Sequence, residues 1–132
     1  MSSEFESTNT GIAAHIGTYA DAVQIPAGAE VVSTSGTPCL RPDGSLPEDF
    51  TEEATQAWHN VEDALSLAGA ALTDIDSVRQ WLTDAADIPA YAKVRSSVIK
   101  HEPVFMLAVI PALVWPNVSV EVEVIAVRQP VA

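Results

Sequence analysis

Apolar side chains repeat with a helical period between residues 51 and 69. They recur every three or four positions, which is the spacing of one face of an α-helix, at Ala54, Ala57, Trp58, Val61 and Leu65. Asp49 or Thr51 can cap the amino end of this helix, and Gly69 can end it. The pattern predicts one long amphipathic helix with Trp58 in the core and His59 turned toward solvent.

Other segments carry the patterns typical of β-strands. Alternating or β-branched apolar runs predict strands at 29–36, 75–88, 104–112 and 118–127, with a further short strand near 20–25. The segment 75–88 fits a helix almost as well from its periodicity alone. Pro89 can open a second helix, 89–101, whereas three prolines and a Pro-Asp-Gly turn predict a loop at 37–50. This order of elements predicts an α+β domain with a mixed sheet and both helices on one face.

The segment 103–124 combines two patterns. It begins as an almost unbroken apolar run and ends in a strict alternation that places Glu121 and Glu123 on the same face of a strand. No Lys or Arg lies between Lys100 and Arg128, so no cation nearby in the sequence compensates these carboxylates. The run is short for a bilayer span and is interrupted by prolines, so we expect no membrane segment.

Composition limits the size and the partners of the protein. The chain has 132 residues, with 6 Lys and Arg against 18 Asp and Glu, and a formal charge of −12. This length fits one domain, 13–132, after a flexible N-terminal segment, 1–12. The charge argues against nucleic acid or an anionic membrane as a partner, because clustered Lys and Arg bind both. Cys39 is the single cysteine, which excludes an internal disulfide and suits a cytoplasmic protein.

Short motifs for common cofactor chemistry are missing. The six glycines are scattered and form no phosphate-binding loop. His15, His59 and His101 lie too far apart in the sequence for a metal-binding motif. We therefore expect neither a metal ion nor another cofactor.

Three stretches, in order along the chain, resemble one known family. HIGTYADAV (15–23) is similar to an N-terminal IGPYSQAV-type motif, residues 31–75 to a unit of strand, Ser-Gly loop and helix, and NVSVEVEVIAV (117–127) to a closing strand. Together they resemble the RidA/YjgF family, the reactive intermediate deaminases. The resemblance implies a chorismate-mutase-like single domain and a homotrimer with small-molecule clefts between subunits. In such a trimer the strand 104–112 would be covered on both faces, which suits its continuous hydrophobicity.

The resemblance also implies which residues form the cleft. A glutamate of the last strand, which positions the attacking water in family enzymes, corresponds to Glu123. The tyrosine of the N-terminal motif corresponds to Tyr19. Further candidates for substrate binding are His15 just before that motif, and Ser35 and Gly36 in the Ser-Gly loop.

One position departs from the family pattern. The arginine that clamps the substrate carboxylate in family deaminases falls at Phe105 or Met106, and its cysteine neighbour falls at Leu107 or Ala108. Replacing an arginine fork by an apolar side chain removes the strong bidentate pairing with a carboxylate. A carboxylate substrate would therefore meet Glu123 without a cation, so we expect 2-imino acids to bind poorly.

These observations favour a trimeric enzyme without standard 2-imino acid deaminase activity. We expect acid/base chemistry on an apolar, non-anionic substrate, either imine or enamine hydrolysis or a tailoring step in biosynthesis. Two alternatives stay open: a non-catalytic module that binds a small molecule or a partner protein, and an ordinary deaminase that works despite the missing arginine. An endoribonuclease is disfavoured by the negative charge and the lack of a basic groove.

Overall fold

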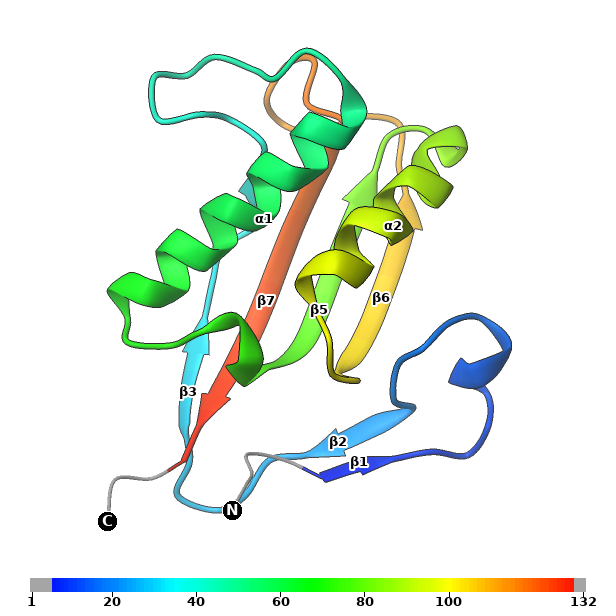
Figure 1. The fold of residues 1–132 in the computed structure, drawn as a ribbon, viewed down its shortest axis with the longest axis vertical. Coiled ribbons are helices and arrows are strands. Elements are labelled where there is room, and N and C mark those ends of the chain that lie inside the picture. The colour runs from blue at the N-terminus through cyan, green and yellow to red at the C-terminus, as the bar shows by residue number, and fades with distance from the viewer. Residues whose placement is uncertain (1–5, 130–132) are drawn as a thin grey trace.

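A five-stranded mixed sheet with both helices on one face forms the body of the protein (Figure 1). The structure, a computed structural model, describes residues 6–129. Helix α1 (Phe50–Leu67) and helix α2 (Ile88–Val98) cover strands β3 (Glu30–Ser33), β4 (Thr37–Pro38), β5 (Ile75–Leu82), β6 (Val104–Val109) and β7 (Val120–Arg128). The strand order is β3-β7-β5-β6, with β4 also on β7; β5 and β6 are parallel and the other pairs are antiparallel. The predicted α+β class is confirmed.

A separate two-stranded sheet precedes this body in the chain. Strand β1 (Glu6–Thr8) pairs antiparallel with β2 (Ala22–Gln24), which confirms the predicted strand near 20–25. The segment 1–12, expected to be flexible, thus contains a paired strand, while residues 1–5 lie outside the described residues. Strand pairing uses backbone groups, so a polar sequence does not prevent it. Asp21 closes the connection by accepting hydrogen bonds from the backbone N–H groups of Thr10 and Ala13 at 2.6 and 2.8 Å.

Several element boundaries differ from those predicted. The strand expected at 29–36 is shorter, β3, and the segment 37–50, expected to be a loop, begins with the two-residue strand β4; both strands pair with β7. The segment 75–88 is a strand only as far as Leu82, and the short 3₁₀ helix η3 (Ala85–Asp87) follows it. Strand β6 ends at Val109, shortly before Pro111, because proline has no N–H to donate to a ladder. The turns η1 (Ala13–His15) and η2 (Leu72–Asp74) were not predicted.

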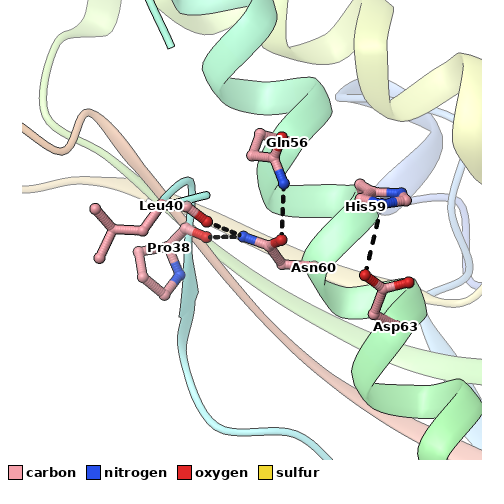
Figure 2. Close-up of polar contacts among 6 residues, drawn as sticks. All are labelled: Pro38, Leu40, Gln56, His59, Asn60 and Asp63. Atoms are coloured by element: carbon pink, nitrogen blue, oxygen red, sulfur yellow. Dashed lines mark hydrogen bonds and ion pairs between the residues drawn. The ribbon is translucent and has the colours of Figure 1, made fainter. Parts of the chain in front are cut away.

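Helix α1 forms as its sequence pattern predicts. Asp49 caps it, with the carboxylate accepting a hydrogen bond from the backbone N–H of Glu52 at 2.8 Å. Gly69 follows the helix with φ +80°, a conformation that favours glycine. The predicted core positions are all buried: Ala54, Ala57, Trp58, Val61 and Leu65. His59 lies on the exposed side of the helix, and its Nε2 is 3.5 Å from the Oδ2 of Asp63 (Figure 2).

Strand β7 is central in the sheet and strand β6 is at its edge. The residues of β7 that face the helices are almost completely buried: Val120, Val122, Val124 and Ala126. Glu121, Glu123 and Ile125 alternate with them and are partly exposed on the opposite face. In the single chain, Met106 and Val109 of β6 are 38% and 43% exposed, whereas the expected cover on both faces of 104–112 refers to a trimer.

Asn60 fixes the chain that follows the Ser-Gly loop against α1. Its side-chain amide donates hydrogen bonds to the carbonyl oxygens of Pro38 and Leu40 at 2.9 and 2.7 Å, and its own oxygen accepts one from the amide of Gln56 at 2.8 Å (Figure 2). A partly buried amide with all these partners holds the neighbouring segment in one position. The loop around Gly36 is thereby held next to β7.

Asp76 is a buried carboxylate whose ionisation should destabilise the fold. It is 1% exposed at an irregularity in the β5–β7 pairing, and its Oδ1 has no hydrogen-bond partner in the described part of the chain. Burial raises the pKa of Asp76 from 3.8 to about 6. Between these two pKa values Asp76 holds a proton in the folded state that it has lost in the unfolded state. The contribution of Asp76 to the free energy of unfolding therefore declines as pH rises from about 4 to about 6.

We predict that Asp76→Asn removes this decline. The gain in free energy of unfolding over the unsubstituted protein should grow between about pH 4 and 6 and then stay constant. Urea unfolding across this range measures the difference. Glu62→Gln, which removes one exposed charge from α1, is the control for net charge. A gain for Asp76→Asn that does not depend on pH would contradict this account.

Cys39 is predicted to be an unreactive thiol in the folded protein. It is completely buried, and its Sγ donates to Oε1 of Glu53 at 3.4 Å. Burial, followed by the charge of Glu53, raises the pKa of Cys39 to about 12. Because only the thiolate reacts, a disulfide reagent such as DTNB should label the native protein about a thousandfold or more slowly than the denatured chain. Rapid labelling of the native protein would show that Cys39 is accessible or ionised.

Candidate functional site

An arginine from the neighbouring strand faces the glutamate that we expected in the site. Arg79 of β5 and Glu123 of β7 are direct partners in the antiparallel register, and the Arg79 Nε lies 3.8 Å from the Glu123 Oε1. The expectation that no cation compensates the charge of Glu123 is therefore wrong. Their side chains are 60% and 35% exposed, so the pair is worth at most about 1 kcal/mol and an incoming ligand can displace it.

Met106 stands beside this pair on the same face of the sheet. It is the parallel partner of Arg79, whereas Phe105 is the partner of the buried Val78 and so faces the helices. Of the two positions where the family arginine was expected, only Met106 thus lies on the same face of the sheet as Glu123, and β5 runs between them. The place beside the Arg79–Glu123 pair is occupied by an apolar thioether.

A buried polar pair holds the main chain of β6 at this point. The amide of Gln80, which is completely buried, donates to the carbonyl oxygen of Met106 at 2.9 Å. The hydroxyl of Tyr91 on α2 donates to Oε1 of Gln80, and burial raises the pKa of Tyr91 well above its usual range. Tyr91 therefore stays a neutral donor, and the pair links α2 to the strand that carries Met106.

Glu121 is placed next to the Ser-Gly loop. A Cβ atom at Gly36 would lie 2.3 Å from the Glu121 Oε2, so the lack of a side chain at Gly36 leaves the space that this carboxylate fills. Ser35 is exposed, and its carbonyl oxygen accepts a hydrogen bond from the Thr37 hydroxyl at 2.9 Å. Of the predicted loop residues, Gly36 thus adjoins Glu121.

A pocket of about 500 Å³ lies along β6, between α2 and the segment that follows η1. Its walls are mostly apolar and include two of the predicted residues, Phe105 and Met106, together with the predicted Tyr19. The rings of Tyr19 and Phe105 meet edge to face with centroids 5.6 Å apart. The other residues that line the pocket are Ile16, Gly17, Ile88, Ala92, Arg95, Leu107 and Val109.

The structure does not bring all the predicted residues to this pocket. His15 lies at the end of η1 with its side chain exposed, and Ala108 is next to Trp81 on the helix-free face. Neither lines the pocket, and neither do Ser35, Gly36 and Glu123. The candidate residues therefore form two neighbouring groups, the pocket and the carboxylate face of β7, which meet at Met106.

Arg95 is a functional candidate that the sequence did not reveal. It lies on α2 with its guanidinium carbon 4.6 Å from the centroid of the Phe105 ring, a cation–π contact inside the pocket. Helical periodicity places Arg95 one turn after Tyr91, but only the packing of α2 over β6 shows that both lie near the site.

The described residues offer no evident metal site and no membrane span. Within residues 6–129, no cluster of three or more His, Cys, Asp and Glu side chains is arranged to hold a metal ion. None of the helices in this range has the length and apolar character needed to cross a bilayer.

Known structures share this fold over nearly the whole chain. A protein of unknown function of the Rid family, YyfB from Yersinia pestis, has a TM-score of 0.81 at 20% identity, covering 94% of this chain and 98% of that one. A YjgF/YER057c/UK114 family member from Mycobacterium tuberculosis has a TM-score of 0.65 at 25% identity, covering 93% and 98%. TdcF from E. coli, solved with bound serine, has a TM-score of 0.71 at 24% identity, covering 97% and 100%.

The sequence itself identifies the family. No curated protein has a sequence that matches this chain. The family model described as Endoribonuclease L-PSP, which includes the RidA/YjgF proteins, matches residues 10–128. Together with the shared fold, this match shows that the chain belongs to the RidA/YjgF family.

Proposed function

We propose that this protein is a small-molecule enzyme of the Rid type without standard 2-imino acid deaminase activity. Its acid/base group is Glu123, and it hydrolyses an imine or enamine whose reacting end carries no carboxylate. The observation that supports this proposal is Met106, an apolar side chain next to Arg79 on the face of the sheet that carries Glu123, at one of the two positions expected for the family arginine.

The chemistry that this arrangement can support is hydrolysis of a C=N bond. Ionised Glu123 accepts a proton from a water molecule as the water oxygen bonds to the imine carbon. The imine nitrogen takes up a proton, and the resulting carbinolamine breaks its C–N bond to release an amine or ammonia and a carbonyl compound. Arg79 holds the carboxylate of Glu123 in place, and the partial exposure of both side chains leaves room for water.

We further propose that the chain acts as a cytoplasmic homotrimer. In the single chain, apolar side chains are exposed on the edge strand β6, at Met106 (38%) and Val109 (43%). An edge strand with exposed apolar side chains is typical of a protein interface. A neighbouring subunit on β6 would cover the mouth of the pocket and exclude bulk water from the site.

The substrate need not be non-anionic throughout, as the sequence led us to expect. That expectation assumed that no cation lies near the cleft, whereas Arg79 faces Glu123 and Arg95 lines the pocket. We still propose that the reacting end of the substrate carries no carboxylate, because Met106 provides no cation there. RNA is not proposed as a substrate, because a formal charge of −12 opposes binding of a polyanion.

A binding module without catalysis is the second candidate. It is favoured by the Arg79–Glu123 pair itself, since a carboxylate held by an arginine can shape a binding surface without taking part in catalysis. Such a module would bind its ligand equally well after Glu123→Gln and would show no turnover.

We predict that Glu123→Gln lowers kcat for imine hydrolysis by about a hundredfold or more, because loss of a general base has effects of this size. Ammonia release from imines generated in situ by an amine oxidase measures the rate, and light scattering checks that the oligomer is unchanged. Glu121→Gln is the matched control, since it removes a carboxylate from the same face two residues away, and it should retain activity within a few-fold. Full activity of Glu123→Gln, or a loss confined to Glu121→Gln, would contradict the assignment.

A further inference from the structure

We infer that the pocket beside β6 binds an apolar carboxylic acid, with its carboxylate on Arg95 and its reactive group at the far end of the molecule. The inference deepens the proposed function by naming the substrate class, and the position of the reactive group rests on that function. The binding of the acid does not rest on the proposed function, because it depends only on Arg95 of α2 and on the other residues that line the pocket.

Arg95 has the features of a cation that lacks its anion. Its side chain is partly buried, and its guanidinium lies over the Phe105 ring. Among residues 6–129, no carboxylate lies within ion-pair distance of it, although acidic side chains outnumber basic ones threefold in the sequence. The cation–π contact fixes one face of the guanidinium, while the N–H donors at its rim remain available to a ligand.

The walls of the pocket define the rest of the ligand. Among the described residues, Arg95 is the only charged one that lines it, and Ile88, Ala92, Leu107 and Val109 supply apolar surface. A volume of about 500 Å³ lies within the range of sites that hold molecules of drug-like size. A small polar amino acid would leave this apolar surface uncovered, whereas an aliphatic or aromatic acid would cover it.

A carboxylate fits Arg95 better than a more highly charged anion does. A guanidinium matches one carboxylate in a bidentate geometry. A phosphate dianion would require further cations, and the part of the chain that the structure describes, 6–129, brings none to the pocket. The ligand is therefore a monoanion with one polar end.

The position of Arg95 separates the carboxylate from the reacting carbon. Arg95 contacts Phe105, which faces the helices, whereas Glu123 lies on the opposite face of the sheet and two strands away. Two strand spacings alone amount to about 10 Å. A substrate that reaches both residues carries its carboxylate many bonds from the imine, unlike a 2-imino acid, whose carboxylate is attached to the imine carbon.

Equilibrium binding of phenylbutyrate and of its neutral amide, phenylbutyramide, tests the inference. Isothermal titration should show that the acid binds the unsubstituted protein about tenfold to a hundredfold more tightly than the amide, as expected for a hydrogen bond to a charged group. Arg95→Met should abolish this preference while binding of the amide persists. Arg95→Lys should retain part of it.

Arg79→Met is the matched control, because it removes the other arginine near Met106 from the opposite face of the sheet. It should leave the preference for the acid unchanged. Equal binding of acid and amide, no binding of either, or a preference that depends on Arg79 instead would overturn the inference. Neither probe contains a reactive C=N bond, so the result does not depend on whether Glu123 is catalytic, and Glu123→Gln should bind the acid normally.

Discussion

The two-residue alternation of β7 is the constraint on which the site depends. Val120, Val122 and Val124 must face the helices, because they form the centre of the core beneath α1. The side chains between them are thereby directed to the opposite face, where Glu121 and Glu123 are partly open to solvent. A shift of this strand by one residue would bury both carboxylates and expose the valines, so the hydrophobic core fixes the position of the acidic groups.

The cations near the site come from elements that are distant in the sequence. Arg79 reaches Glu123 through antiparallel pairing of β5 with β7, and Arg95 reaches the pocket from α2. The same β5 strand carries Gln80, which with Tyr91 fixes the β6 main chain at Met106. In a chain of strongly negative charge, the few arginines near the site are thus placed by the packing of strands and helices.

The fold could be predicted from the sequence largely because its signals are local. Helix α1 was predicted from its apolar spacing and the Asp49 cap, and β7 from its alternation. The parallel pairing of β5 with β6 and the edge position of β6 depend on contacts between distant segments, which periodicity does not encode. For the same reason the expectation that Glu123 has no counter-charge was wrong. Arg79 is distant from Glu123 in the sequence and faces it only because β5 pairs with β7 in this register.

We propose that this Rid-family protein does not recognise a carboxylate at the reacting carbon. Hydrolysis of a 2-imino acid, compared with hydrolysis of the same imine lacking that carboxylate, tests this proposal. We expect kcat/KM for the 2-imino acid to be no higher than for the imine without a carboxylate. A preference of about tenfold or more for the 2-imino acid would mean that another cation performs the role of the missing arginine, and the proposal would be wrong.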